Sequence, residues 1–183
     1  MFNAYDSRRK RPSPTKTDVA TLILATSVIF ASAGSYPHEA FGIPSEPEVV
    51  DHVTIQHAGN GYAASYTLPI YQVGDIRFLS AGVGVEERKA AYPPFPLKLI
   101  FAQAGGAFLT SVSVTIQDSS GKEVLSIPQD RISGPWLFVD LPPGRYQVTA
   151  VRRDGTPVKR TIQVPKGKTK GIYLHWPAPQ KQG

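Results

Sequence analysis

The sequence contains no cysteine, and this absence removes several classes of site at once. Without a thiol the chain cannot carry a disulfide framework, a thiolate metal site or a lipid attached to cysteine. Motifs typical of hydrolases and nucleotide-binding enzymes are missing too: there is no Gly-x-Ser-x-Gly elbow, no phosphate-binding loop and no histidine–acid zinc motif. The sequence therefore predicts a protein that is not an enzyme, and we expect no cofactor and no metal.

Residues 1–33 have the pattern of an export signal. The N-terminal region is basic, with Arg8, Arg9, Lys10, Arg11 and Lys16, and an uncharged apolar stretch follows from Val19 to Phe30. Ala31-Ser32-Ala33 supplies the small residues that signal peptidase requires, which predicts cleavage before Gly34. An uncleaved anchor is the alternative, although the apolar stretch is shorter than the roughly 20 residues of a membrane-spanning helix. In both cases the positive flank directs the rest of the chain outward, and we expect it in the periplasm, with no stable membrane span after cleavage.

The formal net charge of +6 comes partly from this signal. Five of the 20 basic and two of the 14 acidic residues precede Gly34, which leaves 15 against 12 and a surplus of three. So small a surplus does not by itself indicate a nucleic-acid-binding protein. An exported domain without disulfides must be stabilised by its core alone, and the roughly 150 residues from Gly34 onward are enough to form one.

Alternating apolar residues predict an all-β protein rich in turns. A strand runs from Phe138 into Leu141, Pro143 and Gly144 reverse the chain, and apolar residues alternate again along the next strand to Ala150. Seven short strands of this kind are predicted between residues 97 and 177. The strand over 136–141 is apolar on both faces, as a covered central strand is, and the pair 154–155 has the sequence of a two-residue hairpin turn. Short strands separated by turns at this spacing are typical of a Greek-key β-sandwich.

A smaller segment is expected ahead of the sandwich. Strands are predicted over 49–57, 62–68 and 74–78, followed by a short helix that starts near Val85 and ends before Pro93. The predicted organisation is a signal peptide at 1–33, a flexible leader at 34–47, N-terminal strands and a short helix at 48–96, the sandwich at 97–177 and a tail at 178–183. The N-terminal strands and helix are expected either to pack on the sandwich or to extend it.

Two stretches carry a resemblance to a known domain: Val112-Ser-Val-Thr-Ile-Gln-Asp118 with Gly121, and Leu141-Pro-Pro-Gly-Arg-Tyr146-Gln-Val-Thr-Ala150. With these motifs, residues 97–177 resemble the carboxypeptidase regulatory-like domain, a transthyretin-like sandwich related to the collagen-adhesin B-type repeats. The stretches 71–75, 82–88 and 134–137 are similar to a group of small exported bacterial proteins that carry this domain. The resemblance implies the seven-stranded fold but no particular function.

The resemblance to adhesin repeats also raises the question of their lysine–asparagine isopeptide crosslink. Lys98 is suitably placed on the first strand, but no Asn or Asp lies between Thr156 and Gly183. The crosslink is therefore not expected in this chain.

The histidines and the paired glutamates are interpreted as residues without a metal-binding or catalytic role. His52 and His57 lie five residues apart on a predicted strand and so face opposite sides, which prevents them from sharing one metal ion. His38 and His175 are likewise interpreted as surface or hydrogen-bonded residues. Glu86 and Glu87 fit the acidic start of a helix, with catalytic carboxylates as the alternative.

Five residues are expected to have structural roles: Pro143, Gly144, Tyr146, Trp136 and Trp176. Tyr146 is interpreted as a tyrosine corner, whose hydroxyl bonds the nearby backbone of the Pro143-Gly144 turn. Trp136 and Trp176 are assigned to the core, and stacking on a sugar is the alternative for them.

Basic residues gather in one region with Asp154 as the only acid among them: Arg152, Arg153, Lys159, Arg160, Lys166, Lys168 and Lys170. On adjacent predicted strands they either protect a sheet edge against aggregation or bind an anionic polymer such as lipopolysaccharide, an acidic glycan or a membrane surface.

These patterns together predict a non-enzymatic exported module of the cell envelope that binds, or structurally contacts, an envelope protein or an anionic glycan and no nucleic acid. The alternative is a binder of anionic glycan or envelope surface that uses the basic hairpins at 152–170 with Tyr173 or His175. A third hypothesis is an accessory subunit whose exposed strand edges pair with a partner protein. An exposed apolar patch around Phe78, Val83 or Tyr92 would favour that third hypothesis.

Overall fold

Ten strands and two short helices make up the described part of the chain. The computed structural model describes residues 46–59 and 62–178, so the predicted signal peptide, most of the leader and most of the tail lie outside the described residues. The strands are β1 Glu48–Gly59, β2 Tyr62–Val73, β3 Ile76–Ala81, β4 Leu97–Gln103, β5 Val112–Asp118, β6 Glu123–Ile127, β7 Trp136–Val139, β8 Gly144–Arg152, β9 Pro157–Val164 and β10 Lys170–Trp176. The helices are α1 Val85–Lys89 and a 3₁₀ turn, η1 Gln129–Arg131. Neither of these helices has the length and apolar character needed to cross a bilayer.

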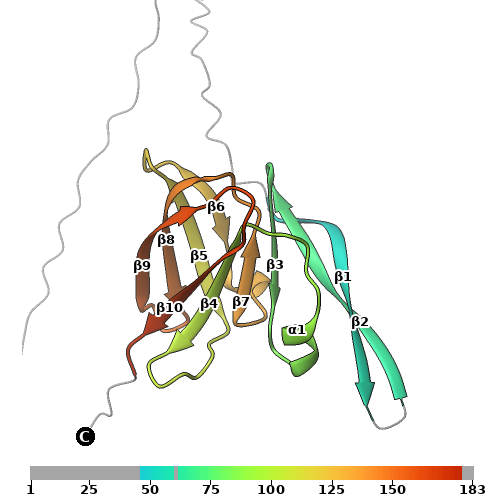
Figure 1. Cartoon of the computed structure of the whole chain (residues 1–183). Coiled ribbons are helices and arrows are strands. Elements are labelled where there is room, and N and C mark those ends of the chain that lie inside the picture. Colours follow the sequence, from blue (N-terminus) through green and yellow to red (C-terminus); the bar gives the residue numbers. More distant parts are fainter. Residues whose placement is uncertain (1–45, 60–61, 179–183) are drawn as a thin grey trace, which may run out of the picture. The chain divides into compact units, whose positions relative to one another are not determined.

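The strands form two sheets (Figure 1). The larger sheet has six strands in the order β1-β2-β3-β7-β4-β10, and the smaller has four in the order β6-β5-β8-β9. β10 runs parallel to β4, with Lys170 opposite Leu97 and Trp176 opposite Gln103. The other ladders are antiparallel.

The prediction of an all-β protein with two sheets is confirmed. Ten strands are present where the sandwich was expected to have seven, because the N-terminal strands are not a separate layer. β3 pairs with β7 from Phe78–Val139 to Ala81–Trp136, so β1, β2 and β3 continue the larger sheet. The sequence left two arrangements open: the N-terminal strands could pack on the sandwich or extend it. In the structure they extend it.

Strand boundaries differ from the prediction near the N-terminus. β2 continues through Pro69 to Val73, and β3 begins only at Ile76, after a turn in which Gly74 has a φ of 56°. Proline is tolerated within β2 because this strand has a partner on one side only at that point: Pro69 pairs with His52 of β1, whereas the β2–β3 ladder starts at Tyr71.

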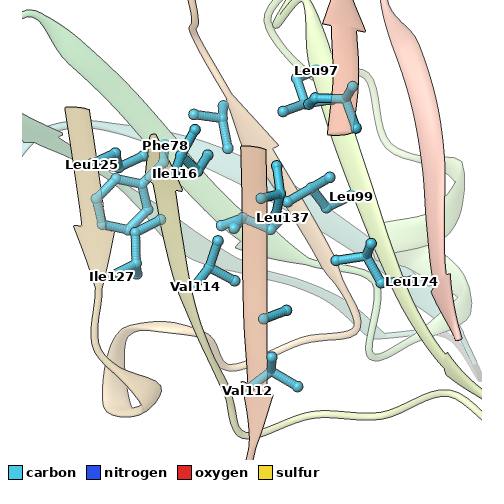
Figure 2. Close-up of a cluster of buried hydrophobic side chains, with 14 of the residues drawn as sticks. Phe78, Leu97, Leu99, Val112, Val114, Ile116, Leu125, Ile127, Leu137 and Leu174 are labelled. Atoms are coloured by element: carbon cyan, nitrogen blue, oxygen red, sulfur yellow. The ribbon is translucent and has the colours of Figure 1, made fainter. Parts of the chain in front are cut away.

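The main core fills the space between the two sheets (Figure 2). Alternate residues of β5 point inward and are buried, as the period of two predicts, and side chains from β3, β4, β7 and β10 meet them from the larger sheet. The side chains labelled in Figure 2 are Phe78, Leu97, Leu99, Val112, Val114, Ile116, Leu125, Ile127, Leu137 and Leu174.

A second apolar cluster lies on the other face of the larger sheet. It contains Val53, Ile55, Ile70, Leu79, Ala81, Phe95 and Phe138. Residues from the segment that follows β3 cover it: Tyr92 stacks on Phe138 with ring centroids 4.6 Å apart, and Ala90 packs beside it. β7 is therefore covered on both faces, as its sequence predicted.

Candidate functional site

The free edges of the two sheets lie side by side where β9 ends the smaller sheet and β10 ends the larger one (Figure 1). A cleft of about 480 Å³ opens between them. Its walls are formed by Arg145, Arg160, Thr161, Ile162, Gln163, Lys170 and Ile172.

Two of the basic side chains stand in rows that otherwise belong to the core. Arg160 is in line with Ile162 and Val164 on β9, both of which are buried. Lys170 begins the row that Ile172 and Leu174 continue on β10. Because burying an unpaired charge is costly, Arg160 interrupts its row between the partly buried Val158 and the buried Ile162, and Lys170 lies at the end of its own row, so a cleft remains open to solvent at these two positions.

A third cation, Arg145 of β8, completes the set. It lies opposite Gln163 in the β8–β9 ladder and reaches the same cleft. None of the three cations makes an ion pair or a side-chain hydrogen bond within residues 46–59 and 62–178. The cleft is therefore a place where positive charge is concentrated without a partner from the described chain, and its two isoleucines add apolar walls.

The sequence analysis did not include Arg145, because it considered only the basic residues between Arg152 and Lys170, and the turn that sets the β8–β9 register also differs from the prediction. The predicted two-residue turn at Asp154-Gly155 is a three-residue loop: the Arg152 N–H donates to the Thr156 carbonyl, and Gly155 has a φ of 83°. A change of one residue in the loop changes which residues face each other across the hairpin. The position of Arg145 beside the cleft could be found only once that register was known.

The other predicted basic residues lie elsewhere. Arg152 pairs with Asp154, and this hydrogen bond, with a second from the Thr156 N–H, lowers the pKa of Asp154 to about 2. Arg153 is exposed in the loop, and Lys159 is exposed on β9 at a position of the opposite parity to Arg160. Lys166 and Lys168 lie in the turn between β9 and β10, where Lys168 borders a different hollow. Two of the seven residues, Arg160 and Lys170, thus share the cleft.

Tyr173 and His175 do not join this cleft. Both are exposed on β10, with their rings stacked at a centroid separation of 5.5 Å. Strand alternation places them on the face of β10 opposite to Ile172 and Leu174. A ligand in the cleft would therefore not contact the aromatic pair that the sequence analysis combined with the basic hairpins.

The residues expected to have structural roles are found in packed surroundings, with one exception. The Tyr146 hydroxyl donates to the Pro142 carbonyl at 3.0 Å, across the turn that contains Pro143 and Gly144, and burial raises the pKa of this tyrosine. Trp176 is fully buried, and its indole N–H donates to the Thr156 carbonyl at 2.9 Å.

Trp136 is the exception, because it is only half-buried and lies on the outer face of the larger sheet rather than in the main core. The Lys98 ammonium is 3.1 Å from the centroid of its ring. Burial lowers the pKa of Lys98. An ammonium over an indole face is a cation–π contact, which gives Lys98 a structural role in place of the crosslink.

Glu87 has a structural role beyond that of an acidic residue at the start of a helix, because its carboxylate accepts hydrogen bonds from other segments. Its side chain is buried, and its carboxylate accepts hydrogen bonds from the N–H groups of Gly82 and Val83, at 2.6 and 3.0 Å, and from the Tyr66 hydroxyl at 3.0 Å. Burial and this hydrogen bond raise the pKa of Tyr66. Glu87 thus joins the loop after β3, helix α1 and the β1–β2 hairpin, and the three donors that it accepts from belong to the protein itself.

A hollow of about 600 Å³ elsewhere in the described chain brings together no set of reactive groups. It is bordered by five prolines and by Asp140, whose carboxylate is paired with Arg77 at 2.6 Å. Within the described residues no three histidine, aspartate or glutamate side chains come close enough to hold a metal ion. Of the three residues whose exposure would have favoured an accessory subunit, Phe78 is fully buried, Val83 is exposed and Tyr92 is half-buried.

No protein-family model, curated protein or solved structure matches this chain. The cleft between β9 and β10 must therefore be interpreted from its own residues.

Proposed function

We propose that this chain is a non-enzymatic, exported module of the cell envelope, periplasmic in location, that binds an anionic ligand in the cleft between β9 and β10. The observation that carries the proposal is the convergence of Arg145, Arg160 and Lys170 on one cleft without an anionic partner among the described residues. The portion from 97 to 177 is proposed to be a carboxypeptidase regulatory-like sandwich with Greek-key connections. The division of β4 to β10 between two sheets supports that assignment.

The chemistry of the cleft favours a carboxylate-, sulfate- or phosphate-bearing ligand. The two guanidinium groups can each offer parallel N–H donors to a planar or tetrahedral anion, and the lysine adds a mobile point charge. Ile162 and Ile172 give the ligand an apolar surface beside the charges. An acidic glycan combines these features, because its sugar rings present both anionic groups and C–H faces.

The competing explanation is that these cations only protect the edges of the two sheets. An inward-pointing charge on an edge strand is a known defence against edge-to-edge aggregation. The two explanations differ in an observable way: protection needs charge of either sign, whereas anion binding needs positive charge at these positions.

The experiment compares two charge-reversed variants with equal net charge. Arg160→Glu with Lys170→Glu reverses the cleft, and Lys159→Glu with Lys166→Glu reverses two cations outside it. Binding of an oligogalacturonide, a carboxylated glycan, is measured by titration calorimetry across a salt series, and circular dichroism checks that each variant is folded. We expect the cleft variant to bind at least about tenfold more weakly or not at all, since the loss of even one charge-assisted hydrogen bond costs roughly 1.5–3 kcal/mol. The control should change the affinity by about twofold at most, because exposed charges outside the cleft contribute little. Equal losses in the two variants, or no binding by the unaltered chain, would contradict the proposal.

A further inference from the structure

The outer edge of β1 differs from the other free edges of the two sheets. β6 has only five residues and is followed by Pro128, β9 begins at Pro157 and carries two cations, and β10 begins at Lys170. Short length, proline and lysine all oppose the addition of a further strand. β1 has twelve residues and contains no proline, lysine or arginine.

The free edge of β1 is regular over most of its length. A bulge separates Val49 from Asp51, and from Asp51 to Gly59 the strand pairs with β2 without interruption. The β2–β3 ladder, by contrast, covers only Tyr71 to Val73. Among the strands of the described residues none pairs with the rest of the β1–β2 hairpin from either side, and Figure 1 shows this hairpin extending away from β3 as an arm.

A hollow borders the middle of β1. A hollow of about 500 Å³ opens between β1 and the segment around α1, lined by Thr54, Gln56, Val85, Glu86, Lys89, Ala90 and Ala91. Thr54 and Gln56 are exposed, whereas Val53 and Ile55 between them are already buried under the second apolar cluster. An added strand would therefore gain backbone hydrogen bonds along β1 without needing to cover new apolar side chains.

We propose that β1 of a second copy of this chain occupies this edge, so that two six-stranded sheets join through an antiparallel β1–β1 ladder about a two-fold axis near Thr54. The proposal is independent of the anionic ligand, because β1 and the β9–β10 cleft lie at different edges of the molecule.

The charges of β1 are compatible with pairing to its own copy and favour the antiparallel direction for that pairing. The two acids of the strand, Glu48 and Asp51, are both at its beginning. An antiparallel ladder centred near Thr54 keeps the acidic ends of the two copies apart, whereas a parallel ladder would place them together. At the centre, Thr54 meets Thr54 and His52 meets Gln56, so polar side chains without a carboxylate face each other in a self-complementary way.

The wall of the hollow is compatible with the same symmetry. It carries one acid, Glu86, and one base, Lys89. The two-fold axis would bring this wall close to the same wall of the second copy, and the four charged side chains would then include two acids and two bases. The interface consists mainly of a backbone ladder and is small, so we expect a dissociation constant in the micromolar range rather than an obligate dimer.

Charge-swapped variants test this dimer. The full-length sequence is expressed, the product is purified, and its mass is measured by sedimentation equilibrium over a range of concentrations. Thr54→Lys with Gln56→Lys places four like charges at the centre of the ladder, and Thr54→Glu with Gln56→Glu does the same with opposite sign. Each variant alone should self-associate at least about tenfold more weakly, and a one-to-one mixture of the two should regain the dimer as a heterodimer. Thr161→Lys with Gln163→Lys makes the same residue changes on another edge strand, β9, and should leave self-association unchanged.

Each possible result of this experiment either supports or overturns the proposal. A monomeric unaltered chain overturns it and leaves the β1 edge for a different protein. Variants that associate as the unaltered chain does, a mixture that fails to regain the dimer, or an equal loss in the β9 control also overturn it, because association would then involve another surface. Circular dichroism melts confirm that a variant which fails to associate is still folded.

Discussion

Replacing Glu87 should destabilise the protein much more than replacing an exposed glutamate. The Glu87 carboxylate accepts two backbone N–H groups, and its side chain is 6% exposed. Glu87→Ala removes the acceptor and leaves the N–H of Gly82, a buried residue, and the N–H of Val83 without their partner. An unsatisfied buried donor costs about 1–3 kcal/mol, so we expect a loss of about 3 kcal/mol in the free energy of unfolding.

The assay is urea denaturation followed by tryptophan fluorescence. Trp136 is a suitable reporter because its ring lies against Gly82, one of the residues that Glu87 holds: a Cβ added at Gly82 would be 2.7 Å from that ring. Glu87→Gln keeps one oxygen that can accept both N–H groups, so this variant should lose only about 1 kcal/mol. Glu123→Ala, an exposed glutamate on β6, is the control and should change stability by less than about 0.5 kcal/mol.

The reasoning fails if Glu87→Ala and Glu123→Ala have the same stability within error. The loop after β3 would then be held by its other contacts, such as the hydrogen bond from the Arg88 side chain to the Gly82 carbonyl at 2.9 Å. A thermal melt gives a second measure: a loss of about 3 kcal/mol in a domain of this size lowers the midpoint by roughly 10 °C.

Two further predictions concern single contacts. Gly134→Ala should prevent folding or cost several kcal/mol, because the new Cβ would lie 2.2 Å from the Ala81 carbonyl oxygen, whereas Gly171→Ala on β10 meets no atom within 4 Å and should keep or slightly raise the melting temperature. Arg152→Gln should raise the pKa of Asp154 from about 2 toward its ordinary value of 3.8, as followed by NMR of the carboxyl carbon. Since the folded pKa lies below the ordinary one, the pair contributes stability above pH 3.8 that disappears as the pH falls toward 2, and this acid-range dependence should be reduced in the variant. An unchanged Asp154 titration would show that the Thr156 N–H, not Arg152, sets its pKa.

The sequence by itself determined the type of fold and most of its strands. Alternation with period two is a local property, since it depends only on which face of a strand meets the core. Val112, Val114 and Ile116 were therefore recognisable as one buried row, and the apolar stretch of β7 as a strand covered on both sides. The turn at Pro143-Gly144 and the hydrogen bond of Tyr146 were predictable for the same reason: donor and acceptor are four residues apart.

Only the tertiary structure decided which distant residues meet. The position of β3 beside β7 depends on long-range pairing that no local pattern encodes, and it makes the N-terminal strands part of the larger sheet and leaves β1 at its edge. The seven basic residues between 152 and 170 are close in sequence but lie on different surfaces, because strand parity and loop length direct neighbouring residues to different faces. Arg145 lies at the cleft with two of them, Arg160 and Lys170, because of the register between β8 and β9. The partners of Glu87 come from the β1–β2 hairpin and from the loop after β3, so its role as a buried clamp exists only in the folded chain.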